Sequence, residues 1–336
     1  MNLFRNDREG RPRAFWRLLS QYTLNTVGTA FLGSLTLAAF AFFGGATLGG
    51  ETIGAPDTAP ALTAAIAVAS LVAALVSVWL AGRFFDHRPF SEFGLRLNRE
   101  WWMELGFGLL LGALLMTGIF LVELEAGWVR VTGAFETTNG GPFFPTVLTP
   151  VLYFLCVGVY EELISRGYQL TNLAEGLNFP SLGPAGAVIL AWVVSSSLFG
   201  VLHLSNPNAT PISSVGITFA GLLLGIGYVL TGRLAIPIGL HITWNLFQGN
   251  VFDFPVSGVE PMGVTFLSIE QGGPNLFTGG VFGPEAGLLG IAASLAGSLL
   301  ILLWVRARSG KANIHTTIYE RSSQLAERKK NFDGAV

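Results

Sequence analysis

Cysteine, histidine and charged side chains are all scarce in this sequence. Of its 336 residues one is cysteine, Cys156, and four are histidine. A single cysteine excludes an internal disulfide and any cysteine-rich metal site. Charged residues make up 12% of the chain, whereas soluble domains carry about 25%, so an ordinary soluble domain is excluded. The net charge is −2, and the charged residues are distributed over many segments without forming a single basic patch. This distribution argues against a nucleic-acid partner.

Long apolar segments take the place of charge. Hydrophobic residues make up 51% of the chain and the mean hydropathy is +0.56, which is typical of a polytopic membrane protein. We expect an all-α fold of about eight transmembrane helices. Their expected ranges are 22–43, 61–81, 107–122, 145–175, 187–204, 215–230, 235–251 and 286–305. The first range is longer than the apolar core of a signal peptide, about 7 to 15 residues, and is therefore interpreted as a membrane span.

The cations indicate how the chain lies in the lipid bilayer. Eight spans place both termini on one side, and of the 19 lysine and arginine residues all except Arg130 fall on that side. The positive-inside rule then predicts cytoplasmic termini and a multi-pass protein of the plasma membrane. We expect one transmembrane domain over residues 1–310 and a basic cytoplasmic tail over residues 311–336, with no internal repeat.

Two adjacent carboxylates, Glu161 and Glu162, end the apolar run 151–159. A carboxylate at bilayer depth costs roughly 2.5 to 3.5 kcal/mol, so a pair of them needs an explanation. Arg166 lies four residues after Glu162, on the same helical face, which favours an ion pair. Glu161 is turned by about 100° and has no partner within its own helix.

Two further apolar spans carry polar side chains. His203 follows Phe199 by four residues, and Asn245 follows His241 by four residues, so each pair shares one helix face. Polar residues inside a membrane nearly always face the bundle interior, and three helices therefore point polar groups at one place. A carboxylate can act as a general base, an imidazole can orient water or bind zinc, and an amide can donate to an oxyanion. These are the parts of an amide hydrolase that uses no serine or cysteine nucleophile. The chain has no H-E-x-x-H motif, so it is not a zincin by motif.

Each polar group also has an explanation without catalysis. The glutamates and Arg166 are equally typical of charges at the cytoplasmic end of a helix. Alone, His203 fits a histidine at a helix end that bonds Ser205 or Asn206. Histidine and asparagine at positions 241 and 245 also suit hydrogen bonds that join helices. Only their joint occurrence favours a site.

The three motifs, in this order on the fourth, fifth and seventh spans, resemble those of the CPBP family. Its members are intramembrane proteases related to the type II CAAX prenyl endopeptidase, also called the ABI family. The matching motifs are Glu161-Glu162-x-x-x-Arg166, Phe199-x-x-x-His203 and His241-x-x-x-Asn245. The resemblance covers about residues 160–258 within a core of about 145–258, and it implies a helical bundle around an intramembrane cavity in which proteolysis takes place.

The resemblance also implies a role for each matched residue. Glu161 would be the general base that activates water, assisted by His203, while His241 and Asn245 would stabilise the oxyanion. Glu162 and Arg166 are assigned a supporting ion pair. The protease would be either a metalloprotease, with Zn²⁺ bound by Glu161, His203 and His241, or a metal-free glutamate protease. A glutamate with one or two histidines is a weaker zinc site than the usual set of three protein ligands and a water, and both options stay open.

One geometric requirement follows from these roles. In a simple register Glu161 lies towards the cytoplasmic side, whereas His203 lies near the opposite end of its helix. The two meet if the fourth helix is long and tilted, with Glu161 near its middle. The segment 205–211 must then dip into the protein interior, since irregular backbone at membrane depth occurs only where it is buried or lines a cavity.

The sequence is compatible with three functions. The first is an intramembrane endopeptidase that cleaves a peptide or membrane protein, either prenylated or leader-bearing. The second is a noncatalytic membrane scaffold or bacteriocin-immunity protein, and a scaffold has no need of an unpaired Glu161. The third is a proton-coupled transporter, which is disfavoured because the sequence shows no inverted repeat.

Overall fold

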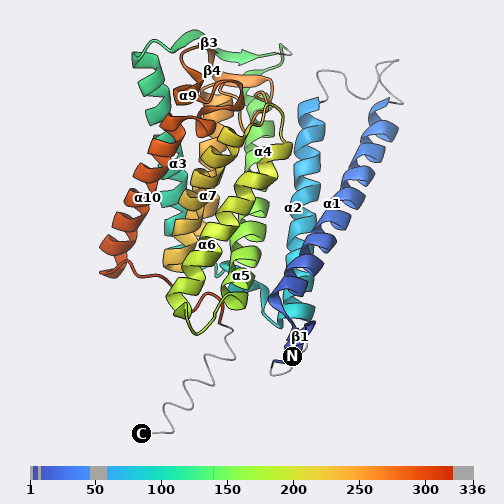
Figure 1. Ribbon diagram of the computed structural model, residues 1–336. Coiled ribbons are helices and arrows are strands. Elements are labelled where there is room, and N and C mark those ends of the chain that lie inside the picture. The colour runs from blue at the N-terminus through green and yellow to red at the C-terminus, as the bar shows by residue number, and fades with distance from the viewer. Residues whose placement is uncertain (1–2, 7–8, 46–58, 139, 321–336) are drawn as a thin grey trace.

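The computed structural model describes residues 3–6, 9–45, 59–138 and 140–320. Within these residues seven helices are long and apolar enough to cross a membrane, and they stand side by side in one bundle (Figure 1). They are α1 (Ala14–Gly45), α2 (Ala59–Ala81), α3 (Arg99–Glu125), α4 (Phe143–Glu162) with its continuation, α6 (Gly183–Leu202), α7 (Pro211–Thr231) and α10 (Leu288–Ser309). The expected all-α membrane fold is confirmed.

The remaining predicted span, 235–251, is a shorter buried helix. It consists of α8 (Ala235–Leu246) and a π-helical turn η5 (Phe247–Val251). Glycines let α8 lie directly on α3: a Cβ atom on Gly108 would lie 2.4 Å from the carbonyl oxygen of Ile236, and one on Gly239 would lie 2.4 Å from that of Leu105. Small residues at such crossings bring helix backbones together, as is common in membrane bundles.

The fourth span is long, as the site geometry required. Helix α4 continues through the π-helical turn η3 (Leu163–Leu170) into α5 (Thr171–Gly176), so one helical segment runs over 34 residues from Phe143 to Gly176. Glu161 lies near its middle. π-Helical turns inside α-helices occur frequently at functional sites.

The connections between α3 and α4 and between η5 and α10 contain several glycines and prolines, and together they form a β-ribbon. Strand β3 (Val129–Thr137) pairs antiparallel with β4 (Val264–Gln271), with a bulge between Val131 and Gly133. Both strands are rich in β-branched and aromatic residues, which favour strands. The sequence did not predict them, because glycines and prolines on either side are typical of loops. The ribbon caps the end of the bundle that is uppermost in Figure 1.

The opposite end of the bundle carries the start of α1 and the end of α10 (Figure 1). A second small sheet lies there, formed by β1 (Arg5–Asn6) and β2 (Arg11–Pro12). Beside it the Arg17 guanidinium binds the Asp86 carboxylate at 2.7 Å, and the Tyr168 hydroxyl donates to the same carboxylate at 2.6 Å. All three side chains are buried, so this end is closed by an ionic network.

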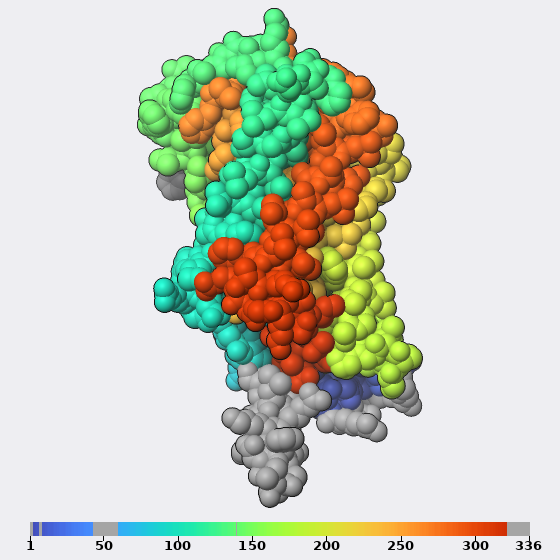
Figure 2. Space-filling view, turned by 90° about the vertical axis from the view of Figure 1, so that its left-hand side faces the viewer, coloured from blue at the N-terminus to red at the C-terminus, as the bar shows by residue number. Residues whose placement is uncertain are grey.

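Short elements complete the described chain. These are η1 (Gly82–Asp86), η2 (Phe90–Phe93), η4 (His203–Ser205), α9 (Asn275–Thr278), η6 (Gly280–Phe282) and η7 (Pro284–Ala286). Helices α3 and α10 share one face of the molecule (Figure 2), where the Phe107 and Trp304 rings stack with centroids 4.3 Å apart. After α10 the chain returns to the bundle, since the His315 amide donates to the Val229 carbonyl at 2.8 Å. Most of the predicted basic tail, 321–336, lies outside the described residues.

Candidate active site

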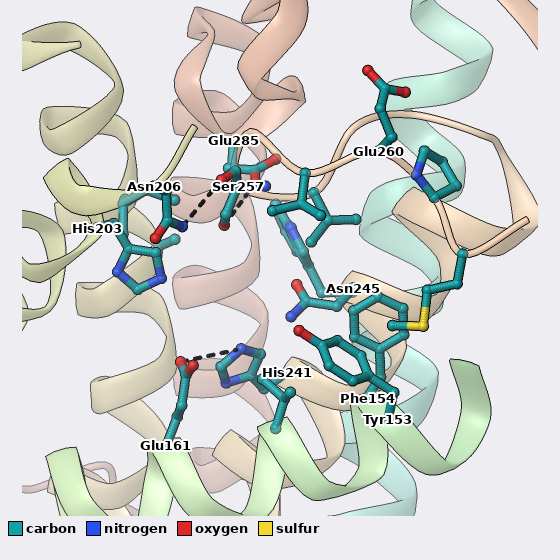
Figure 3. Close-up of a pocket in the computed structure, with 18 of the residues that line it drawn as sticks. Tyr153, Phe154, Glu161, His203, Asn206, His241, Asn245, Ser257, Glu260 and Glu285 are labelled. Carbon is teal, nitrogen blue, oxygen red and sulfur yellow. Dashed lines mark hydrogen bonds and ion pairs between the residues drawn. The ribbon is translucent and has the colours of Figure 1, made fainter. Parts of the chain in front are cut away.

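The four residues predicted to act in catalysis all line one cavity. Glu161 of α4, His203 at the end of α6, and His241 and Asn245 of α8 face a space of about 470 Å³ between the helices (Figure 3). Apolar side chains from α4, α6 and α7 form much of its wall. A cavity of this size, mainly apolar with a few convergent polar groups, is typical of a ligand or substrate site.

The two adjacent glutamates have different surroundings. Glu162 is fully buried, and its Oε1 accepts from Arg166 Nη1 at 2.7 Å. Arg166 is itself 1% exposed, donates to the Gly221 carbonyl at 3.0 Å and stacks 4.5 Å above the Phe199 ring. Glu161, by contrast, keeps 23% of its side chain exposed and faces the cavity. Only Glu161 is therefore in a position to meet water or a substrate there.

His241 links the two glutamates. Its Nδ1 lies 2.9 Å from Glu162 Oε1, and its Nε2 lies 3.9 Å from Glu161 Oε2. Because an ionised carboxylate only accepts, Nδ1 carries the proton and donates to Glu162. Nε2 then faces Glu161 and the cavity. The buried pair of Glu162 and Arg166 thus fixes the orientation of the His241 ring.

His203 is held by its own helix. Its Nδ1 lies 2.7 Å from the Phe199 carbonyl oxygen, which can only accept, so Nδ1 is the donor and Nε2 of the neutral ring keeps its lone pair. The polar groups after it are engaged elsewhere: Ser205 Oγ donates to the Leu202 carbonyl at 3.0 Å, and Asn206 Nδ2 donates to the Ser257 carbonyl at 3.0 Å. His203 is thus not held by Ser205 or Asn206, as a histidine at a simple loop end would be.

The prediction that the segment 205–211 dips into the protein interior is wrong: none of its residues is buried, and it reaches the site through one residue. Asn206 lines the cavity, whereas Pro207 and Asn208 are exposed. Asn208 Nδ2 donates to the Gly258 carbonyl at 3.2 Å. A Cβ atom on Gly258, whose φ is +83°, would lie 1.8 Å from the Pro207 carbonyl oxygen. Only glycine allows the two loops to meet this closely, and together they form the rim of the cavity.

Glu285 is a cavity residue that the sequence did not single out. It is buried, and its Oε1 accepts from the Ser257 amide at 2.6 Å and from the Ser257 hydroxyl at 3.2 Å, while its Oε2 accepts from Gln248 Nε2. Burial raises the pKa of Glu285 from 4.5 to about 7, although these hydrogen bonds oppose the shift. A carboxylate in a Gly- and Pro-rich connection gives no sequence signal, because polar residues are ordinary there.

The site does not form a complete zinc site. Among the described residues no group of three histidine, cysteine, aspartate or glutamate side chains gathers in metal-ligand geometry. A catalytic zinc needs about three protein ligands around one point. The arrangement therefore does not fit the ion as it stands, and the chemistry is derived from the side chains alone.

Comparison with known proteins gives a family. Residues 143–247 match the model of the family described as type II CAAX prenyl endopeptidase Rce1-like, and the match includes all four predicted catalytic residues. The chain is also similar to the uncharacterized protein YyaK of Bacillus subtilis (strain 168), with 26% identity over 181 residues. That match covers 52% of this chain and 56% of YyaK, a little over half the length of that relative. No solved structure matches the chain. Residues 143–247, from the start of α4 to the end of α8, are thus similar to the Rce1-like family, as the motifs had indicated.

Proposed function

We propose that the protein is an intramembrane endopeptidase that hydrolyses peptide bonds with a water activated by Glu161 and His203. The observation that carries this proposal is the contrast within the glutamate pair. Glu162 is buried and paired, whereas the Glu161 carboxylate faces a cavity that His203, His241 and Asn245 also line. A structural role needs no carboxylate exposed to an intramembrane cavity.

The proposed reaction begins with a water held between Glu161 and His203 Nε2. Glu161 accepts a proton from the water as its oxygen attacks the peptide carbonyl carbon. The carbonyl oxygen becomes negative, and the Asn245 amide donates to it, together with His241 Nε2 when that nitrogen is protonated. The C–N bond then breaks, and Glu161 returns its proton to the leaving amine. Each of these groups lies on a helix wall of the cavity, so little reorganisation is needed.

The substrate and the orientation are further parts of the proposal. By the positive-inside rule we propose that the arginine-rich end of the bundle lies in the cytoplasm and that the protein is in the plasma membrane. The substrate is a membrane-associated polypeptide, either prenylated or leader-bearing. The Rce1-like match supports a CAAX-type protease in general.

A peptide-library assay tests the proposal. Detergent-purified protein is incubated with quenched peptides, and wild type is compared with Glu161→Gln and His203→Ala, each with and without a zinc chelator. We expect cleavage by wild type, loss in both variants and no effect of the chelator. Cleavage that the chelator abolishes would indicate a metalloprotease. Full activity in Glu161→Gln would remove the general base, and no cleavage by any form would favour a noncatalytic scaffold.

A further inference from the structure

The cavity extends towards one end of the bundle only. It reaches along α4 as far as Glu161, along α7 as far as Leu224 and along α8 as far as Leu240. In the other direction it continues past Thr138 and the loop 259–263, which adjoin the β3–β4 ribbon. Glu161 and His241 therefore lie at the floor of a pocket, and its mouth is at the ribbon end.

The mouth of the pocket is lined by exposed residues. Thr138, Val259 and Glu260 are exposed and line the cavity, and His203 is half-buried. In Figure 3 the Glu260 side chain points away from Glu161, which lies at the far side of the same space. Water and an extended peptide can thus approach Glu161 from the ribbon end.

The opposite direction is blocked by packed side chains. The turn η3 follows Glu161 and Glu162 directly, and seven of its eight residues are buried. Arg166 in this turn is fixed between Glu162 and the Gly221 carbonyl, and Tyr168 donates to the buried Asp86. This layer of ionic and aromatic groups separates the cavity floor from the arginine-rich end.

The distribution of lysine and arginine predicts which end of the bundle lies on which side of the membrane. Arg130 on β3 is the one cation that the sequence assigns to the ribbon side, and it is itself paired with Glu270 at 2.5 Å. Apart from Arg166 inside the bundle, the sequence assigns the remaining lysines and arginines to the opposite side, which the positive-inside rule places in the cytoplasm. The pocket mouth then faces away from the cytoplasm.

We infer that the active-site cavity opens to the non-cytoplasmic face and that the substrates are polypeptide segments presented on that face. This inference rests on the proposed endopeptidase function. It narrows the substrate class to secreted or membrane-anchored chains, such as a leader-bearing polypeptide during or after export. A chain end that stays in the cytoplasm, as on a cytosolic prenylated protein, would meet the closed end of the bundle.

Cysteine accessibility tests the direction without requiring activity. In a Cys156→Ala background, Ala220→Cys places a thiol on the α7 wall of the cavity, and Thr138→Cys and Lys311→Cys mark the ribbon end and the opposite end. The probe is a charged, membrane-impermeant thiosulfonate applied to intact cells and to inverted membrane vesicles. We expect the thiols at 220 and 138 to react in intact cells, and the thiol at 311 only in inverted vesicles. Reaction at 220 only where the thiol at 311 reacts, or at neither side, would overturn the inference.

A sided cleavage assay separates this inference from the proposed function. A charged quenched peptide that wild type cleaves in detergent is added to intact cells or to inverted vesicles. We expect at least tenfold faster cleavage by intact cells, with Glu161→Gln as the inactive control. Faster cleavage by inverted vesicles would overturn the inference while leaving the protease intact. No cleavage in detergent, together with outward labelling at position 220, would refute the protease and leave the outward opening established.

Discussion

At the scale of single residues, the two adjacent glutamates have different roles: Glu161 is the proposed general base, and Glu162 supports the site. Glu161 faces the cavity with 23% of its side chain exposed, whereas Glu162 is fully buried between Arg166 and His241. The same substitution should therefore have different consequences at the two positions. We expect Glu161→Gln to retain the fold and to lose at least about 10²-fold in peptide cleavage, which is typical for removal of a general base.

Glu162→Gln is the matched counterpart. It leaves the Arg166 charge buried without its ionic partner, and breaking a buried pair in this way costs about 3 to 5 kcal/mol. Stability can be followed with the protein's own Cys156, which is 1% exposed and reacts with a thiol-sensitive dye only on unfolding. We expect a lower unfolding temperature for Glu162→Gln than for Glu161→Gln. Equal unfolding temperatures would contradict the division of roles.

Glu285 makes stability depend on pH. Burial raises its pKa from 4.5 to about 7, so the folded state binds a proton that the unfolded state releases between these values. Its contribution is fully present below pH 4.5 and is lost as the pH rises through about 7. At about 1.36 kcal/mol per pKa unit the loss amounts to roughly 3 kcal/mol.

Thermal unfolding from pH 4.5 to 8 checks this expectation. Wild type should lose stability relative to Glu285→Gln as the pH rises, because the amide cannot ionise. Glu260→Gln, an exposed carboxylate on the same cavity, serves as the control and should follow wild type. Parallel curves for wild type and Glu285→Gln would show that the carboxyl group at position 285 does not titrate in this range.

The sequence could point to Glu161, His203, His241 and Asn245 because each is a polar residue inside an otherwise apolar span. Such residues are costly in a bilayer and therefore carry information. Glu285 could not be found in this way, since it lies in a polar connection. Its burial arises only when the loop around Ser257 packs against it, a contact between residues 28 apart in the chain.

At the scale of elements, α8 depends on its contact with α3. This helix carries His241 and Asn245, and Gly108 and Gly239 allow the two backbones to approach. We expect Gly108→Ala to destabilise the protein by about 1 to 3 kcal/mol, as overpacking in a tight contact does. It should also lower cleavage, because α8 shifts relative to Glu161. Unfolding temperature and cleavage rate are the measurements.

Gly106→Ala is the control on the same helix. A Cβ atom there meets no other atom within 4 Å, so the fold and the activity should be preserved. Stability should rise by no more than about 1 kcal/mol, the amount by which alanine exceeds glycine in a helix. Equal effects of the two substitutions would mean that the α3–α8 contact is not what positions the site.

The elements themselves were only partly predictable. The spans follow from apolar runs of membrane length, a signal that survives without tertiary context. The β3–β4 ribbon does not follow in this way, because its strands lie 127 residues apart at the pair Thr137 and Val264 and each is flanked by glycine. Its pairing arises only after the bundle has brought both connections to the same end.

At the scale of the whole molecule, helices α1 and α2 lie outside residues 143–247, which match the family model. Ion pairs and a hydrogen bond connect the two parts. Arg17 of α1 binds Asp86 at 2.7 Å and Glu175 at 2.9 Å, and Tyr168 donates to the same Asp86. Arg17 is 2% exposed. This network connects the amino-terminal helices to the lower end of the α4–α5 segment, on the side away from the cavity mouth.

Arg17→Leu should therefore weaken the molecule without altering its chemistry. It removes the cation that is paired with the buried Asp86, whereas Glu175 keeps its ion pair with Arg11, and we expect a loss of about 3 to 5 kcal/mol in the free energy of unfolding. Cleavage per folded molecule, measured well below the unfolding temperature, should stay within about twofold of wild type, because Arg17 does not line the cavity. Arg83→Leu, at an exposed position, is the control and should change stability by less than about 0.5 kcal/mol. A loss of activity without a loss of stability in Arg17→Leu would instead mean that the arginine-rich end of the bundle is coupled to Glu161 at the cavity floor through η3.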